Sequence, residues 1–196
     1  MNKKQLFIAA VAAVLSVSGV NASVITGVEG NGGIFNINPE HVNGDVGYRQ
    51  YDQFELSKGD IANLIYKYGQ RDLETFINLV DGQVKIDGIL NTMRDGNFYN
   101  GHAIFISPNG MVVGASGVLN VGSLSVVTPT DDKYNTLKGD YAARNYTNIN
   151  QISKLKQDSN ADITIAGKVF ARNGVDLRGA NINVSGDILN GKLQML

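Results

Sequence analysis

Short runs in which apolar and polar residues alternate, separated by turn-forming residues, recur through most of the chain. In the run Gln83–Gly88, Val84 and Ile86 point to one side of an extended strand and the polar residues point to the other. The same pattern recurs in residues 103–106, 118–122, 162–167 and 181–186. Glycine is frequent (23 residues) and proline is rare (3), which suits many tight turns. The sequence therefore predicts an all-β protein.

The last two runs align at an offset of 19 residues, so that Ile163 matches Ile182 and Ile165 matches Val184. A strand-and-turn unit of this size cannot bury its apolar side alone, whereas stacked units bury one continuous core. The offset favours a parallel β-helix in which the matched residues of adjacent coils contact each other. An antiparallel β-sandwich is the alternative, because alternation with frequent turns also describes that class.

One segment follows a different period. Residues 57–69 carry apolar side chains at helical spacing, namely Ile61, Leu64, Ile65 and Tyr68. Ser57 can cap the start of a helix and Gly69 can end it. We therefore predict one short amphipathic helix here. The alternative is another strand, interrupted by Gly59, because short helices are marginally stable alone.

Three further regions complete the predicted organisation. Residues 23–47 contain short β-like runs between glycines and asparagines, and we expect them to cap the β-helix. Residues 128–160 carry charges of both signs without alternation, so we expect an excursion outside the coils. The alternating pattern continues almost to Leu196 without the polar cap that a solenoid end needs. We therefore expect this chain to be the amino-terminal part of a longer protein.

Residues 1–22 have the organisation of an export signal. Two lysines near the start precede an apolar run over residues 6–17, and small residues follow, which predicts cleavage between Ala22 and Ser23. The apolar run is shorter than the roughly 20 residues of a membrane-spanning helix. The chain 23–196 is therefore predicted to be secreted or held at the cell surface after export through the periplasm.

The composition argues against several functional classes. Lys and Arg number 17 against 18 for Asp and Glu, so the net charge of −1 gives no electrostatic footprint for nucleic acid. There are no cysteines, which excludes disulfides, thiolate zinc sites and cysteine nucleophiles.

Other polar features carry little chemistry. His41 and His102 lie in unrelated contexts without a second ligand at metal-binding spacing. Residues 30–33 lack the lysine and helix of a phosphate loop. Asp131-Asp132 and Asp95-Gly96-Asn97 have too few ligands for a calcium loop and are interpreted as solvated turns. We predict no catalytic residue, no metal and no cofactor.

The longest distinctive motif reads Gly-His-Ala-Ile-Phe-Ile-Ser-Pro-Asn-Gly-Met-Val-Val-Gly over residues 101–114 and continues as Ala-Ser-Gly-Val-Leu-Asn-Val-Gly-Ser-Leu to residue 124. It resembles the haemagglutination-activity, or two-partner secretion, domain of filamentous-haemagglutinin-like adhesins, haemolysins and leukotoxins. Residues 54–64 and 86–91 are similar to other family segments, so that the resemblance covers about residues 23–128.

The family's Asn-Pro-Asn-Gly signature is matched here by Ser107-Pro108-Asn109-Gly110, with serine in place of the first asparagine. Its second signature, Asn-Pro-Asn-Leu, is matched only by Asn78 and Leu79. The fixed φ of Pro108 followed by Asn109-Gly110 also predicts a tight turn after a strand, whatever its function.

The resemblance implies a right-handed parallel β-helix that an outer-membrane β-barrel transporter recognises and exports, and that contacts host or neighbouring cells. It implies that the transporter-recognition residues are Ser107, Pro108, Asn109, Gly110, Asn78 and Leu79. Two alternatives stay open at this point: a polysaccharide-acting enzyme on a β-helix, and the front end of a toxin-delivery protein. An enzyme would need clustered carboxylates, or a carboxylate and arginine pair, on one face, whereas the aspartates here are scattered among turns.

Overall fold

The computed structural model describes residues 21–154, 160–189 and 193–195. Most of the predicted signal peptide, residues 1–20, lies outside this described part. Strands account for 52% of the described residues, which also contain one α-helix. The expected all-β class is therefore confirmed, and the strands lie mainly in large parallel sheets, one of them strongly curled.

The strands lie in three rows, and within a row each strand pairs with its neighbours. The first row is a six-stranded sheet whose members are parallel, apart from an antiparallel strand at its amino-terminal end. In spatial order the strands are β1 (Val24–Ile25), β5 (Phe54–Leu56), β10 (Val84–Ile86), β14 (Met111–Val113), β16 (Ile163–Ile165) and β18 (Ile182–Val184).

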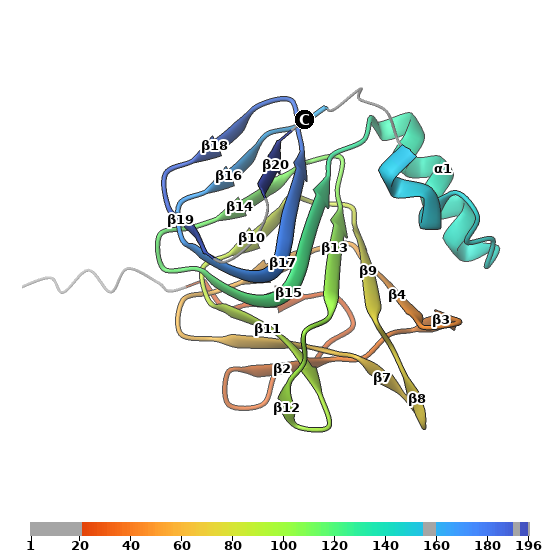
Figure 1. Ribbon diagram of the computed structural model, residues 1–196, viewed down its shortest axis with the longest axis horizontal. Helices are drawn as coiled ribbons and strands as arrows, with labels where there is room; N and C mark the ends of the chain where they lie inside the picture. Colours follow the sequence, from red (N-terminus) through yellow and green to blue (C-terminus); the bar gives the residue numbers. More distant parts are fainter. Residues whose placement is uncertain (1–20, 155–159, 190–192, 196) are drawn as a thin grey trace, which may run out of the picture.

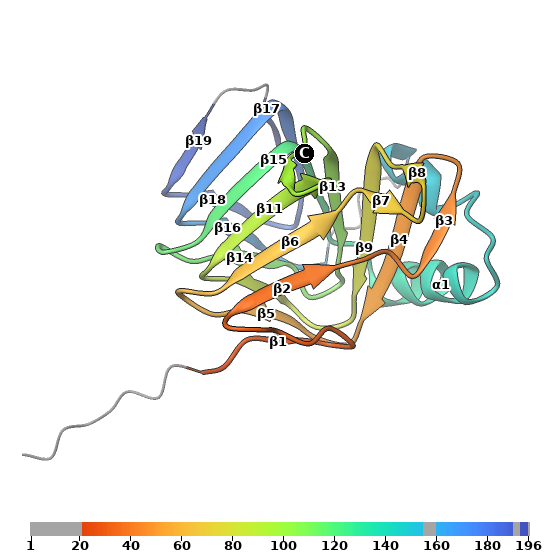
Figure 2. The same cartoon turned by 90° about the horizontal axis from the view of Figure 1, so that it is seen from below.

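The second and third rows belong to one twelve-stranded sheet and are joined by two long strands, β15 (Val118–Val127) and β17 (Lys168–Arg178). The second row contains β2 (Ile34–Ile37), β6 (Ile61–Ile65), β11 (Ile89–Arg94), the first halves of β15 and β17, and β19 (Asp187–Leu189). The third row contains β3 (His41–Asn43), β4 (Val46–Tyr51), β9 (Thr75–Val80), β13 (His102–Ile106), the second halves of β15 and β17, and β20 (Leu193–Met195). Figure 2 shows the second row rising in sequence order from β2 and β6.

The register between β15 and β17 shifts between Val121 and Ser123, where the two strands pass from the second row to the third. Two short hairpins extend from the rows. One is formed by β7 (Lys67–Tyr68) and β8 (Arg71–Asp72), and in the other β12 (Asn97–Phe98) folds back on β11.

The inward side chains of all three rows form one hydrophobic core. Aromatic rings connect the rows: the Tyr51 and Phe54 rings meet edge to face at 5.2 Å, and the Phe54 and Phe105 rings at 5.4 Å. Such contacts stabilise a core beyond the burial of apolar area. The core therefore depends on side chains that are distant in sequence.

The predicted 19-residue register is confirmed, because Ile163 pairs with Ile182 and Ile165 with Val184 in neighbouring parallel strands. Parallel pairing dominates all three rows, so the antiparallel sandwich was the wrong alternative.

The predicted helix over residues 57–69 is wrong. Residues 61–65 form strand β6, in which Ala62 and Leu64 are buried and the residues between them point outward. Ile61 pairs in register with Ile34 and Ile89 of the flanking strands. Because β6 carries apolar residues on both sides, its apolar positions also fit the spacing of a helix. Pairing with two strands outweighs the weak propensity of a short isolated helix.

Residues 128–160, expected to leave the strand pattern, contain α1 (Asp131–Ala142) and the 3-10 helix η1 (Ile149–Lys154). Thr130 caps α1, its hydroxyl accepting a hydrogen bond from the Lys133 backbone N–H at 3.5 Å. Both elements lie beside the outer side of the third row (Figure 1). Tyr134, Leu137, Tyr141 and Ile149 are buried there against Tyr48, Ile77, Leu79, Ile104, Ile106 and Val127.

Asp81, just after β9, ties α1 to this row. Its carboxylate accepts hydrogen bonds from the Tyr134 hydroxyl at 2.8 Å and from Lys138 Nζ at 2.5 Å. Burial, reinforced by the neighbouring Asp81 carboxylate, raises the pKa of the Tyr134 phenol far above its usual value, so Tyr134 remains a donor. Residues 131–154, from the start of α1 to the end of η1, are called the helical segment below. This segment is held against the third row by charge-assisted hydrogen bonds as well as by apolar contacts.

Candidate functional site

The turn Ser107–Gly110 follows β13 directly and leads into β14. Gly110 N–H donates to the Ser107 carbonyl at 3.3 Å, which closes the turn. Gly110 has a φ of +81°, and a Cβ at this position would stand 2.1 Å from the Asp162 carbonyl oxygen. The turn therefore requires glycine for its backbone conformation and for the close approach of the Asp162 backbone.

This turn is hydrogen-bonded to an earlier turn of the chain, at Asp81 and Gly82 between β9 and β10. Ser107 Oγ donates to the Gly82 carbonyl at 2.7 Å, and Asn109 Nδ2 donates to the Asp81 carbonyl at 2.6 Å. Ser107 Oγ also accepts from the Asn109 N–H at 3.1 Å. Ser107 thus connects this turn to Gly82, 25 residues earlier in the chain.

Only one side chain of the turn faces solvent. Ser107, Pro108 and Gly110 are buried, whereas Asn109 is exposed. The hydroxyl of Ser107 is used inside the fold, in its bond to the Gly82 carbonyl. Any recognition of this turn through side chains depends on Asn109.

The second predicted pair, Asn78 and Leu79, lies on β9 beside β13, with the two residues pointing to opposite sides. Asn78 is fully buried in the core, where its Oδ1 accepts from the Tyr51 hydroxyl at 2.8 Å and its Nδ2 donates to the Ile104 carbonyl at 3.1 Å. Leu79 is fully buried beneath the helical segment, and its register partner is Ile106. The structure thus places Leu79 near the start of the turn and Asn78 inside the protein.

The predicted cleavage site lies before β1. Ala22 is exposed, and the hydroxyl of Ser23 donates to Asp60 Oδ2 at 2.5 Å and accepts from the Ser57 N–H at 2.8 Å. The chain is thus anchored to the fold at the residue that cleavage would make the first.

The polar residues that were interpreted above as non-functional make contacts within the fold. The His41 ring stacks on Tyr141 with centroids 4.7 Å apart. Asp131 and Asp132 lie in the first turn of α1, where acidic residues complement the helix dipole. Asp95 bonds Lys67 at 2.7 Å. Among the described residues, no group of three or more potential metal ligands gathers at one place.

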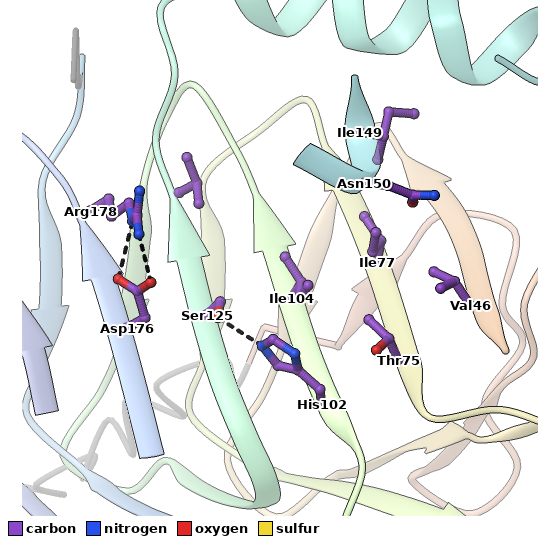
Figure 3. A pocket seen from close by; sticks show the side chains of 11 residues that line it. Val46, Thr75, Ile77, His102, Ile104, Ser125, Ile149, Asn150, Asp176 and Arg178 are labelled. Atoms are coloured by element: carbon purple, nitrogen blue, oxygen red, sulfur yellow. Dashed lines mark hydrogen bonds and ion pairs between the residues drawn. The ribbon is translucent and has the colours of Figure 1, made fainter. Parts of the chain in front are cut away.

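A groove of about 420 Å³ lies on the outer side of the third row, next to η1 (Figure 3). His102, Ser125 and Asp176 project into it from the neighbouring strands β13, β15 and β17. His102 Nε2 and Ser125 Oγ are 2.7 Å apart. Burial lowers the pKa of His102, and the Asp176 carboxylate partly opposes that shift. The imidazole is therefore neutral at pH 7 and can accept the serine proton in a hydrogen bond.

Arg178 engages both carboxylate oxygens of Asp176, with Nε at 3.1 Å from Oδ1 and Nη2 at 2.9 Å from Oδ2. This bidentate pair directs the carboxylate toward the guanidinium (Figure 3). Sequence reasoning missed the groove, because His102, Ser125 and Asp176 are distant in sequence and become neighbours only through the register of parallel strands. The outward position of each residue in its strand was the available signal.

Neither the protein-family models nor the curated proteins compared with this chain give a match. Within the described ranges, no helix is long and apolar enough to cross a membrane.

Proposed function

We propose that this chain is the secretion domain of an exported, filamentous-haemagglutinin-like adhesin, recognised by an outer-membrane β-barrel transporter of the two-partner type. The three rows of strands are then the faces of a right-handed parallel β-helix. The observation that carries the proposal is the turn Ser107–Gly110, which matches the family signature in sequence and exposes Asn109 at the end of a strand. The exported product would be secreted or held at the cell surface, in contact with host or neighbouring cells.

The order of pairing supports a role in folding during export. In the first row, the parallel strands pair in the order of the chain, β5 with β10, β10 with β14, β14 with β16 and β16 with β18. A chain that emerges from a transporter can therefore add one coil at a time, since each coil needs only its predecessor as a template. We propose that the amino-terminal coils act as the folding seed.

The proposal assigns no catalytic role to the His102 groove. A carboxylate acting as general acid or base needs an oxygen directed at the substrate. Both oxygens of Asp176 are engaged by Arg178 instead. This arrangement disfavours the alternative of a polysaccharide-acting enzyme.

Replacement of Asn109 by alanine tests the recognition role. The exposed side chain makes one hydrogen bond to the Asp81 carbonyl, so its loss costs about 1 kcal/mol and leaves the fold intact. Export is expected to fall nonetheless. The measurement compares secreted and periplasmic amounts of the chain in a host that supplies the cognate transporter, with circular dichroism of the purified variant.

Asn173→Ala is the matched control, because Asn173 is also exposed and also precedes a glycine. Its export should equal that of the parent chain. Normal export of Asn109→Ala with an intact fold would reduce the signature turn to a structural corner.

A further inference from the structure

The outer side of the second row carries a ladder of asparagines, one from each successive strand: Asn36, Asn63, Asn91 and Asn120. Each amide donates to its predecessor, at 3.0 Å from Asn63 to Asn36, 3.1 Å from Asn91 to Asn63 and 2.8 Å from Asn120 to Asn91. An amide has two N–H donors and two acceptor lone pairs, and the ladder uses at most one of each. Every rung therefore keeps a donor and an acceptor for a ligand.

The ladder opens into a groove of about 480 Å³ where β17 follows β15. Asn91 and Asn120 lie on one side of it, and Phe170 takes the register position after Asn120. Phe98, on the hairpin strand β12, also lines the groove and is 38% exposed. Amide groups, the exposed Phe98 ring and the half-buried Phe170 ring thus meet in one depression.

Among the described residues, Arg172 is the one cation that lines the groove. The Arg172 guanidinium lies 4.8 Å from the centre of the Phe98 ring, and the side chain is exposed. Within the described residues it forms no salt bridge, and the groove lining includes no carboxylate. The groove therefore suits a ligand group with one negative charge.

We propose that the asparagine ladder and this groove bind an extended acidic oligosaccharide. Its hydroxyl groups bond the free amide donors and acceptors, the apolar face of a pyranose ring packs on Phe98, and a uronate carboxylate pairs with Arg172. The rungs repeat at the strand spacing of about 4.8 Å, similar to the length of one sugar unit in an extended chain. The ligand runs along the stack of coils, across the strands.

The chemistry of this surface disfavours two other polymers. An extended peptide that adds to a sheet needs an unpaired strand edge, but the central strands of this row are already paired on both sides. Nucleic acid needs many cations along its backbone, and the described part of the groove lining offers only Arg172. The sugar site is independent of the export role, since it is tested with purified protein in the absence of a transporter.

The test measures binding of two tetrasaccharides to the chain by isothermal titration calorimetry. One is β-1,4-linked mannotetraose, and the other is its β-1,4-linked mannuronate counterpart, which differs only in the carboxylates. We expect the mannuronate to bind at least about tenfold more tightly than the neutral sugar. Arg172→Ala should remove this preference, and Phe98→Ala should weaken both ligands, with circular dichroism spectra unchanged.

Lys168→Ala is the control, because Lys168 is an exposed cation on the same outer side but not part of the groove. It should change the affinity less than about twofold, given that surface charges act weakly at a distance. An equal loss in Lys168→Ala and Arg172→Ala would mean diffuse attraction and would overturn the site. So would equal affinity for the two sugars, or no binding of either at millimolar concentration.

Discussion

The outer sides of the second and third rows are built differently, although the two rows share β15 and β17. In the third row, Phe76–Val80 of β9 and Ala103–Ile106 of β13 are buried without interruption. In the second row, β6 and β11 alternate between buried and more accessible positions. The helical segment covers the third row, whereas the asparagine ladder faces outward from the second.

The comparison explains how the sequence pattern arises. A strand covered on one side needs apolar residues only at every second position, whereas a strand covered on both sides needs them throughout. The continuous run in β13 was thus a signal that something packs on the outer side of the third row. Periodicity alone did not identify the covering element as residues 131–154.

The largest expected effect comes from shortening a side chain on the covered side. Leu79→Ala leaves a cavity beneath α1 and should lower the free energy of unfolding by about 2–5 kcal/mol, because Leu79 is fully buried. Ile89→Ala on the open side is the control. Ile89 is 36% exposed, and its loss should cost less than about 1.5 kcal/mol. Equal losses in urea denaturation would contradict the difference between the two rows.

A smaller effect is expected from removing the carboxylate that anchors the cover. Asp81→Ala deletes the acceptor of Tyr134 and Lys138 and should cost about 2 kcal/mol, since hydrogen bonds to a charged group are stronger than neutral ones and Asp81 is half-buried. Hydrogen exchange should accelerate in α1 more than in β10 or β14. Asp72→Ala is the control, because that aspartate forms only long ion pairs and is 57% exposed. Uniform acceleration throughout the chain would argue against a local anchor.

The mainly β class and the register of β16 with β18 were predictable, because each depends on local alternation and on a repeat visible in the sequence. The strand at residues 61–65 was not predictable from the sequence, because the apolar Ile61 and Ile65 on its outer side give it the spacing of a helix as well as that of a strand. Only pairing with β2 and β11 decides in favour of the strand. The helix α1 was missed for a related reason. Its polar sequence has only three buried side chains, which find their partners on strands far away in the chain.

The turn after β13 could be located from Pro108 and Gly110, whose backbone requirements are local. The burial of Ser107 could not be predicted, since it depends on the carbonyl of Gly82, 25 residues earlier in the chain. The asparagine ladder was visible in the sequence only as separate residues. Its continuity requires the register between neighbouring strands of the second row.

The covered row should also respond to alkaline pH. Burial raises the pKa of Tyr48 to about 12, against the lowering effect of its hydrogen bond to Asn150. The folded state therefore holds this proton more tightly than the unfolded state, whose tyrosine titrates near 10. The stabilisation from Tyr48 is complete below pH 10 and declines as the pH rises from 10 to 12.

Tyr48→Phe removes this titration together with the bond to Asn150. At pH 8 the variant should be less stable by about 1 kcal/mol. The difference should shrink or reverse at pH 11.5, when both proteins are compared in urea. A difference that stays constant between the two pH values would show that Tyr48 does not titrate on unfolding.

The smallest effect is expected on the open side, in the asparagine ladder. Asn91 bonds both its neighbours, whereas Asn36 at the end bonds only Asn63. These amides are partly accessible, so water replaces most of a lost hydrogen bond. Asn91→Ala should lower the free energy of unfolding by about 1 kcal/mol, and Asn36→Ala by about 0.5 kcal/mol. Thermal unfolding monitored by circular dichroism can resolve the two. If Asn36→Ala lowers the free energy of unfolding as much as Asn91→Ala, the asparagines act as separate surface residues rather than as a chain of mutually supporting amides.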